Sequence, residues 1–353
     1  MIRHLVFFIL AVLFSIQAVA SEYRPLNVMF LNPGHPSNNP TGHFWPNVNY
    51  FMQEAADDLD INLTTIYANR NHILMKSFAT DVIAQKPDFA VLVNEKGVAI
   101  NLVEEITKHK IRVFMLLNDL SDEELSSLSP EQRQYYAGSL TPNNFDAGFS
   151  LAEQLHDSLV ANKTTHGKVN VLALHGDTTS PASIARAEGL NSFLNSHPEI
   201  RLIDSTVANW SKQHAYEKVK GILKHQKVDI IWAANDAMAC GATSAVASYN
   251  LLPAVRIGGI NWDDDIPEGR LAVSVGGHVT LGAYAMVMLK ELSEGKRQSE
   301  RIEHAIFQHS NIKAYQAFKS ALQQKRFNQC NFADFLDDSD TKRTFSIDNL
   351  ICE

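Results

Sequence analysis

The sequence predicts an α/β fold made of two doubly wound parallel-sheet lobes that are joined by a hinge. From residue 26 onward, short apolar runs rich in β-branched residues alternate with segments of helical periodicity. The alternation stops at a polar stretch near residue 140 and then restarts. A chain of 353 residues is long enough for two lobes of ordinary domain size.

The first half contains successive strand-and-helix steps. Strands are expected at 26–31, 61–67, 88–93 and 112–117, and helices at 48–59, 73–84 and 98–108. In the first of these helices Val48, Phe51, Met52 and Ala55 fall on one face. Such a repeat favours a parallel sheet with helices on both faces.

The second half repeats the same order after a polar stretch rich in Ser, Thr, Pro and Asn. Helices are expected at 146–159, 183–195, 213–225 and 237–249, and strands at 168–174, 201–207, 228–234, 256–260 and 271–275. Parallel sheets place ligand-binding groups on the loops at the carboxyl ends of their strands. Those loops are therefore where we look for a site.

Residues 1–20 are typical of a secretory signal peptide. Arg3 and His4 precede the apolar run 5–16, and Ala18-Val19-Ala20 forms a small-x-small cleavage site before Ser21. The apolar run is too short for a permanent membrane span, although an uncleaved anchor remains the alternative. We expect a soluble mature chain that starts at Ser21 in the periplasm.

Composition limits the classes of partner. The formal net charge is −8, with 31 Lys and Arg against 39 Asp and Glu, and no basic cluster stands out, so nucleic acid is not an expected partner. Of the three cysteines, Cys240 lies in an apolar helical stretch and is expected to be a buried thiol. Cys330 and Cys352 flank the polar C-terminal tail, and export would permit a disulfide between them.

The loop after the first strand carries Phe44 and Trp45 directly before a helix. Flat aromatic faces can pack on the C–H faces of a sugar ring, but the same residues can also attach the start of the helix to the core. Both interpretations stay open at this point.

Other strand ends carry Asn or Asp, residue types that also serve as turn and helix-cap residues. They occur as Asn94-Glu95, Asn118-Asp119, His175-Gly176-Asp177, Asn235-Asp236 and Asn261-Trp262-Asp263. Their recurrence at successive carboxyl ends favours a site that grips a polyol or similar ligand. Arg186, in the helix after the His175 loop, could hold a hydroxyl pair or a carboxylate, or be a surface charge. As ligand contacts, Arg186 and Asn235 would be removable without loss of stability.

Several segments together resemble one known family. They are residues 28–32, 90–94, 136–153, 186–190 and above all the run Ala-Asn-Asp-Ala-Met-Ala-Cys-Gly-Ala at 234–242. Over residues 26 to 320 the chain resembles the periplasmic sugar-binding receptors of the ribose/galactose type, whose core is shared with lactose-repressor-like regulators.

The resemblance implies a type I periplasmic binding protein fold and a set of ligand-binding positions. By resemblance the lobes would be 21–140 plus 279–303 and 141–278 plus 304–322, followed by a C-terminal tail at 323–353. The binding positions would be Phe44, Trp45, Asn94, Asn118, Arg186, Asn235 and Asn261, with His278 as the nearest polar candidate on the last loop.

Three departures move the chain towards the autoinducer-binding relatives. Family members usually carry Asp where Asn261 stands, and Trp262 and the insertion 119–135 are atypical. The resemblance implies a monomeric receptor, without cofactor, that closes around a sugar-like ligand and presents it to an importer of the ATP-binding-cassette type. Two alternatives remain: a sensory binding protein that signals to a membrane kinase or cyclase, and an exported hydrolase or lyase on this fold.

Other chemistries find little support in the sequence. There is no Gly-x-Ser-x-Gly elbow, no P-loop and no His-Glu-x-x-His pair. The fourteen His residues are scattered without metal-ligand spacing. We expect Asp263-Asp264-Asp265 to be a solvated capping loop rather than a cation site, since a hard cation takes at least about six oxygen ligands.

Overall fold

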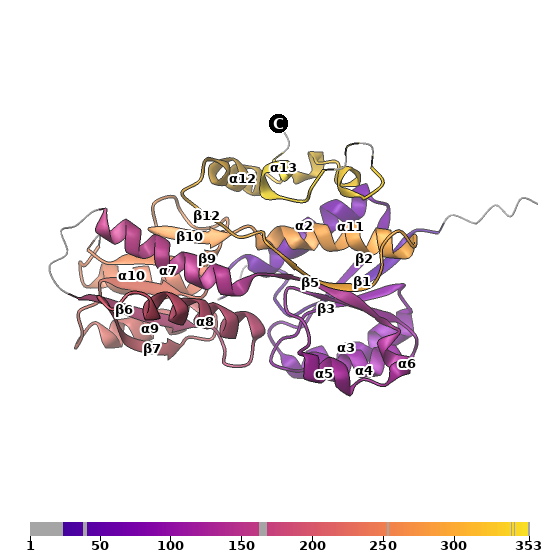
Figure 1. The fold of residues 1–353 in the computed structure, drawn as a ribbon, viewed down its shortest axis with the longest axis horizontal. Helices are drawn as coiled ribbons and strands as arrows, with labels where there is room; N and C mark the ends of the chain where they lie inside the picture. The colour runs from indigo at the N-terminus through magenta and orange to yellow at the C-terminus, as the bar shows by residue number, and fades with distance from the viewer. Residues whose placement is uncertain are drawn as a thin grey trace, which may run out of the picture.

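The computed structural model describes residues 24–37, 41–161, 168–252, 254–339, 341 and 343–351. Within them, two six-stranded sheets with flanking helices form two lobes that lie side by side (Figure 1). The expected fold class is confirmed. The signal segment expected at 1–20 lies outside the described residues.

The first sheet has the strand order β11-β5-β4-β3-β1-β2, with every pair parallel. Its strands are β1 Leu26–Asn32, β2 Ile61–Tyr67, β3 Phe89–Leu92, β4 Arg112–Leu116, β5 Tyr136–Pro142 and β11 Glu300–His304. Its helices are α2 Phe44–Asp58, α3 His72–Gln85, α4 Ala99–Lys108, α5 Asp122–Ser127, α6 Pro130–Arg133 and α11 Leu281–Ser293.

The second sheet has the order β12-β10-β9-β8-β6-β7, and only the short β12 runs antiparallel. Its strands are β6 Val169–His175, β7 Ile200–Val207, β8 Ile230–Ala233, β9 Arg256–Asn261, β10 Val273–Gly276 and β12 Gln308–His309. Its helices are α7 Asn144–Val160, α8 Pro181–Asn195, α9 Lys212–Ile222 and α10 Asp236–Ser248.

Three segments connect the lobes. One passes from β5 into α7, a second from β10 through the short helix η1 (His278–Thr280) into α11, and a third from β11 to β12. Because each lobe is completed by chain that returns from the other, the lobes are joined along one side (Figure 1). A multi-segment hinge of this kind allows the lobes to open and close without unfolding either.

The sequence-based prediction missed strand β5 and the two short helices that precede it. β5 contains Gly138, Ser139 and Thr141, so it lacks the apolar run by which the other strands were recognised. Helices α5 and α6 each begin with a capping box, from Ser121 and Ser129 respectively. The Ser-x-x-Glu/Gln pattern that marks such a start was present in the sequence.

The end of the chain packs on the first lobe. Helix α12 (Lys313–Gln323) buries Phe318 and Leu322 in the core cluster that contains α2 and α11. The tail follows as η2 (Arg326–Gln329), η3 (Phe332–Phe335) and α13 (Ile347–Leu350). It adds Phe327, Phe332, Phe345 and Leu350 to the same cluster. In Figure 1 this yellow segment lies along α2 and α11.

The tail is hydrogen-bonded to a buried ion pair at α11. The Glu291 side chain is fully buried, and its Oε2 accepts from Arg297 Nε at 2.5 Å. Its other oxygen accepts from the backbone N–H of Asp337 at 2.7 Å. A buried carboxylate needs such partners because an unpaired charge in the interior is costly. The tail therefore braces the first lobe through polar as well as apolar contacts.

The two described cysteines are both buried. Cys240 lies inside α10, as expected, and burial raises the pKa of its thiol to about 12. Cys330 Sγ donates to the carbonyl of Leu350 at 3.1 Å, which brings the chain end close to this thiol. Cys352 lies outside the described residues, so the disulfide stays a prediction.

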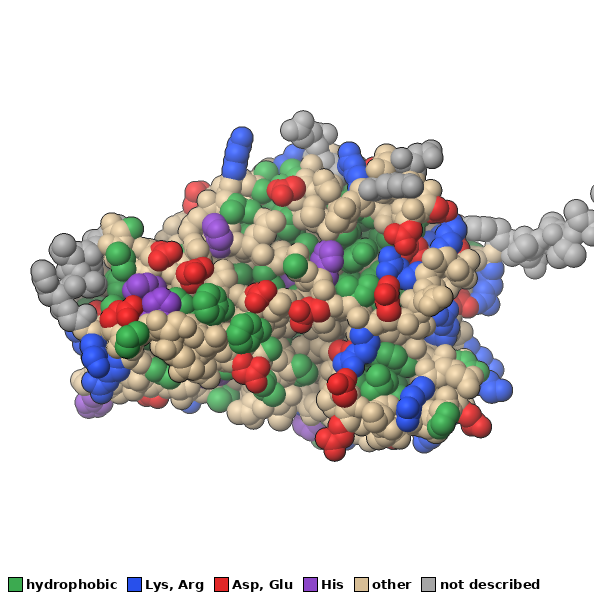
Figure 2. Space-filling view, in the orientation of Figure 1, with side chains coloured by type: hydrophobic (Ala, Val, Ile, Leu, Met, Phe, Trp, Pro, Cys, Tyr) green, Lys and Arg blue, Asp and Glu red, His purple; other side chains and the backbone are tan. Residues whose placement is uncertain are grey.

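On the face shown in Figure 2, acidic and basic side chains lie interspersed over the first lobe rather than in one-sign patches. None of the helices within the described ranges has the length and apolar character needed to cross a bilayer.

The tail contact gives a stability prediction. Phe332 is fully buried against α2 and α11, so Phe332→Ala should lower the free energy of unfolding by about 3–5 kcal/mol. Urea unfolding followed by far-UV circular dichroism measures it. Ile73→Ala is the control, because Ile73 is 70% exposed and its truncation should change stability by about 0.5 kcal/mol at most. Equal effects of the two substitutions would show that the tail does not brace the lobe.

The disulfide prediction is tested by thiol labelling. Of the three cysteines, only Cys240 should react with iodoacetamide in denaturant without reductant, because Cys330 and Cys352 are bonded. Mass spectrometry of the exported protein counts the labels. Three labels per chain would rule the bond out.

Candidate functional site

A cavity of about 530 Å³, partly open to solvent, lies between the lobes at the carboxyl ends of both sheets. The structure brings most of the candidate residues together at this cavity and leaves Asn94 out. The candidates that line it are Phe44, Trp45, Asn118, Arg186, Asn235, Asn261 and His278.

The first lobe contributes an aromatic wall. Phe44 and Trp45 meet edge to face, with ring centroids 5.0 Å apart, and the Phe44 ring also contacts His278. Trp45 is buried in the core cluster and its carbonyl accepts from Asn32 Nδ2 at 3.3 Å. The pair therefore does both things that the sequence allowed: it anchors the start of α2 and lines the cavity.

Arg186 lies at the centre of the second lobe's wall and is only 4% exposed. Its Nε donates to Asn144 Oδ1 at 2.9 Å and one terminal nitrogen donates to the carbonyl of Ala234 at 2.7 Å. The other terminal nitrogen is 3.2 Å from His278 Nε2. Burial lowers its pKa to about 9, opposed by the negative charge of Asp236, so the guanidinium stays charged at neutral pH. The alternative of a surface charge is wrong for this residue.

His278 is held as a neutral ring. A guanidinium only donates, so Nε2 must accept from Arg186 and the proton must reside on Nδ1. Burial, followed by the positive charge of Arg186, lowers the pKa of His278 well below its ordinary value. The ring is 1% exposed, and Nδ1 has no hydrogen-bond partner among the described residues. A spare donor therefore accompanies the guanidinium.

Two asparagines of the cavity also have structural roles. Asn235 caps α10, with Oδ1 accepting from the Met238 N–H at 2.9 Å and Nδ2 donating to the carbonyl of Trp210 at 3.2 Å. Asn118 reaches across the cavity, where its Oδ1 accepts from the Ala182 N–H at 3.1 Å. The lobes thus touch at the start of α8. The expectation that Asn235 and Arg186 are dispensable for stability is not supported by these contacts.

Backbone strain is concentrated at the strand ends that border the cavity. Leu117, after β4, has φ 67°. Asn261, the last residue of β9, and Trp262, which follows it, have φ 155° and 63°. Non-glycine residues rarely adopt such conformations unless surrounding contacts hold them, and functional sites are a common location. The atypical Trp262 is held in this way, because its Nε1 donates to the Ser274 carbonyl at 3.1 Å and its ring packs on Phe318.

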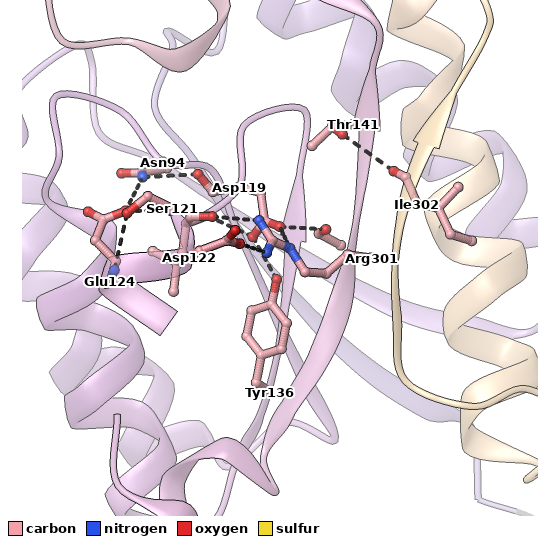
Figure 3. A network of polar contacts seen from close by, with 11 residues as sticks. Asn94, Asp119, Ser121, Asp122, Glu124, Tyr136, Thr141, Arg301 and Ile302 are labelled. Carbon is pink, nitrogen blue, oxygen red and sulfur yellow. Dashed lines mark hydrogen bonds and ion pairs between the residues drawn. The ribbon is translucent and has the colours of Figure 1, made fainter. Parts of the chain in front are cut away.

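Asn94 is turned away from the cavity into a polar network of the first lobe (Figure 3). Its Nδ2 donates to the Asp119 carbonyl at 3.1 Å and to Glu124 Oε2 at 3.3 Å. Arg301, from β11, closes the same network by pairing with Asp119 and Asp122. Hydrogen bonds to the insertion that contains α5 thus hold the Asn94 side chain away from the cavity, and Glu95 lines the cavity instead.

Arg70 and Trp210, which the sequence-based analysis did not select, also line the cavity. So does Glu95, which that analysis named in a strand-end pair but not as a binding position. Arg70 and Glu95 form an ion pair of 3.2 Å. Burial raises the pKa of Glu95, which Arg70 opposes and the charge of Asp177 reinforces. Trp210 donates through Nε1 to Asp177 Oδ2 at 2.8 Å.

Arg70 and Trp210 occupy equivalent places in the two lobes. Each follows an Ala-Asn pair after an edge strand, as Ala68-Asn69-Arg70 after β2 and Ala208-Asn209-Trp210 after β7. In both triplets the second and third residues have positive φ, between 51° and 62°. The repeated Ala-Asn signal was visible in the sequence, but these loops carry no Asn-Asp pair and were passed over.

Two glycines leave room for the aromatic rings of Trp45 and Trp210. A Cβ on Gly34 would lie 2.3 Å from the Trp45 side chain, and one on Gly176 would lie 2.1 Å from the Trp210 ring. Real Cβ atoms do not come so close, so any larger residue would displace an aromatic wall.

The acidic loop after β9 differs from expectation. Asp263 is 2% exposed, so the prediction of a solvated loop is wrong for this residue. Asp264 Oδ1 accepts from Asn47 Nδ2 at 2.9 Å and lies at the same distance from His43 Nδ1. His43, Asp264 and Asp265 place ligand atoms within 4.8 Å of one another. Three such groups are fewer than the oxygens a hard cation takes, and these already bind each other.

Residues 36–324 match the family model of the periplasmic binding protein domain. The chain is 26% identical to a xylitol-binding protein of Mycolicibacterium smegmatis over 60% of this chain and 59% of that protein. It is 21% identical to a D-apiose import binding protein of Actinobacillus succinogenes over 76% of this chain and 88% of that one. The crystal structure of a periplasmic sugar-binding protein from Pseudomonas fluorescens superposes with a TM-score of 0.81 at 25% identity, covering 92% of this chain and 99% of that one.

Asn235 can be tested against a matched cap. Asn235→Ala removes the cap of α10, and Asn71→Ala removes the cap of α3, which lies outside the cavity lining. Each should lower the unfolding free energy by about 1 kcal/mol, because each exposes unpaired helix N–H groups. Only Asn235→Ala should also weaken ligand binding, by about tenfold or more.

Calorimetric titration and thermal melts of the same samples measure both quantities. Equal affinities of the two variants would make Asn235 a helix cap and nothing more.

Proposed function

The chain belongs to the periplasmic binding protein family, and on that premise we propose that it is an exported sugar-binding receptor. It binds a sugar or sugar-like molecule between its lobes, outside the cytoplasm, and presents the closed form to a membrane importer of the ATP-binding-cassette type. It acts as a monomer and performs no chemistry on the ligand.

The cavity between the lobes is the observation that carries this proposal. Its walls combine aromatic faces, from Phe44, Trp45 and Trp210, with planar polar groups, from Asn118 and Arg186. Aromatic faces suit the C–H faces of a sugar ring, and planar donors and acceptors suit pairs of neighbouring hydroxyls. A site of this kind recognises a small polyhydroxylated ligand.

Contacts across the cavity support closure around the ligand. Asn118 of the first lobe meets the start of α8, and Phe44 contacts His278 on the segment that crosses between the lobes. A ligand that touches both walls binds the closed arrangement better than an open one, and so shifts the population towards it. A membrane partner that recognises the closed shape then responds only to loaded receptor.

The names of the relatives support the transport role. One curated relative is an import binding protein and another binds a polyol, and both are binding proteins rather than enzymes. The structure from Pseudomonas fluorescens, which covers nearly the whole chain, is a periplasmic sugar-binding protein. An importer is therefore a better-supported partner than a sensor kinase or cyclase.

Tryptophan emission tests the function directly. Trp45 and Trp210 line the cavity, whereas Trp232 and Trp262 are buried elsewhere. We expect saturable changes in emission when the cognate monosaccharide or sugar derivative is titrated into protein freed of bound ligand by unfolding and refolding. Trp210→Phe should reduce the change, and Trp232→Phe should leave it intact.

Mass spectrometry of molecules released from protein purified from its native host identifies the ligand to titrate. Bound ligand should also raise the melting temperature, since it stabilises only the folded state. The proposal fails if no released molecule and no member of a broad panel of neutral and acidic sugars and polyols changes the emission or the melting temperature.

A further inference from the structure

The positions of the carboxylates at the strand ends determine which class of ligand the cavity can bind. Acidic residues follow many of the strands whose ends face the cavity: Glu95, Asp119, Asp177, Asp236 and Asp263. Of these, Glu95 lines the cavity and the others do not. This matters because sugar hydroxyls donate hydrogen bonds as well as accept them, and carboxylates are the strongest acceptors a protein offers.

Asp119 is used inside the first lobe. Its Oδ1 accepts from the Tyr136 hydroxyl at 2.6 Å, and its Oδ2 accepts from Ser139 Oγ at 2.7 Å and from Arg301 Nε at 2.6 Å (Figure 3). Both oxygens therefore have partners on the side of the sheet edge away from the ligand, although Asn118 beside it lines the cavity.

The second lobe uses its acids in the same way. Asp177 accepts from Trp210 Nε1 at 2.8 Å and from the Ser180 N–H at 2.8 Å. Burial would raise the pKa of Asp177, but these hydrogen bonds and those from Thr179 lower it below its ordinary value. Asp236 accepts from Ser274 Oγ at 2.8 Å.

Asp263 is buried behind Gly42, close to Asp236. Burial, and then the charge of Asp236, raises the pKa of Asp263 well above its ordinary value, and Asp263 is not among the residues that line the cavity.

Three amide oxygens of the cavity each have one donor within the protein. Asn118 Oδ1 accepts from Ala182 N–H, Asn144 Oδ1 from Arg186 Nε, and Asn235 Oδ1 from Met238 N–H. The charged groups of the lining are unequal in number: the residues that line the cavity include two guanidinium groups, Arg70 and Arg186, and one carboxylate, Glu95. The lining therefore carries an excess of positive charge.

Arg186 is the strongest of the donors. A guanidinium has five N–H groups, and the protein contacts described above use three. No carboxylate within the described residues forms an ion pair with it; Asp236 acts on it only through its charge. The terminal nitrogens thus retain two N–H groups, and His278 Nδ1–H is a further donor without a partner among the described residues.

The opposite wall differs in character. Glu95 pairs with Arg70 through Oε2, and its other oxygen can accept ligand hydroxyls. The cavity is therefore polarised, with the carboxylate of Glu95 on the first lobe and the unused guanidinium N–H groups of Arg186 on the second.

We propose that the ligand is a small polyhydroxylated carboxylate, that is, a sugar acid, whose carboxylate lies against Arg186 while its hydroxyls face Glu95. The proposal rests on the sugar-binding function above and specifies its ligand class. A carboxylate supplies acceptors without protons of its own, which matches the unused guanidinium N–H groups, and planar Arg–carboxylate pairing adds orientation.

Matched ligand pairs test the proposal on the unaltered protein. Each pair shares a carbon skeleton: an aldonate with its alditol, and a uronate with its aldose, over C5 and C6 sugars of several configurations. Calorimetric competition should show the acid of the best pair binding about tenfold to hundredfold more tightly than its neutral partner.

Variants then locate the preference. In Arg186→Gln the acid should lose its advantage, and Arg186→Lys, which keeps the charge but not the fork, should retain part of it. Arg112→Gln, which removes a half-buried Arg outside the cavity lining, should leave the ratio unchanged. If Arg186→Gln does not fold, Arg186→Lys and the unaltered protein still provide the comparison.

The outcomes are distinct. Neutral partners that bind as tightly as their acids, or more tightly, would overturn the ligand class and leave the sugar receptor standing. Binding of neither class would remove the receptor function and the ligand class together. An acid preference that persists undiminished in Arg186→Gln or Arg186→Lys would overturn the placement of the carboxylate at Arg186.

Discussion

The buried guanidinium of Arg186 is the interaction around which the site is organised. It joins four parts of the chain, because it stands on α8 and donates to Asn144 at the start of α7, to Ala234 at the end of β8 and to His278 on a crossing segment. A charge in the interior is tolerated only when hydrogen bonds replace its water. Here three hydrogen bonds replace part of the water around Arg186. They require that the start of α7, helix α8 and His278 lie close to the guanidinium. Burial, and then the charge of Arg186, keeps the ring of His278 neutral.

The two lobes solve one problem in the same way. Each lobe must bring a large side chain from an edge strand to a cavity at the centre of the molecule, and each does it with an Ala-Asn pair and two left-handed residues, ending in Arg70 or in Trp210. Gly34 leaves room for the ring of Trp45, and Gly176 leaves room for the ring of Trp210. The same backbone device therefore delivers a cation in one lobe and an aromatic face in the other.

The alternating apolar runs were enough to predict the two lobes, since buried parallel strands need nearly continuous hydrophobic stretches. β5 escaped because its polar residues are buried by tertiary contacts, such as the hydrogen bond from Ser139 to Asp119. Asn118 was found because strand ends converge, and Arg186 because it lies in the helix after one of those ends and in a segment that resembles the family. The position of Asn94 depends on Glu124, in an insertion whose packing no local pattern reveals. Periodicity predicts which residues of an element are buried. It does not predict which polar side chains will form hydrogen bonds with one another.

Apolar contacts join the lobes on the hinge side, and polar contacts join them around the cavity. On the hinge side, Trp262 leaves the second sheet and packs its ring on Tyr315 and Phe318, within the core that α12 and the tail complete. Around the cavity, the cross-lobe contacts include a hydrogen bond between Asn118 and Ala182, which water can replace at little net cost. A hydrogen bond of this kind can break when the cavity opens, while the apolar joint on the hinge side stays intact. A ligand that contacts both walls adds interactions between the lobes at the cavity. A modest binding energy is then enough to shift the equilibrium between open and closed forms.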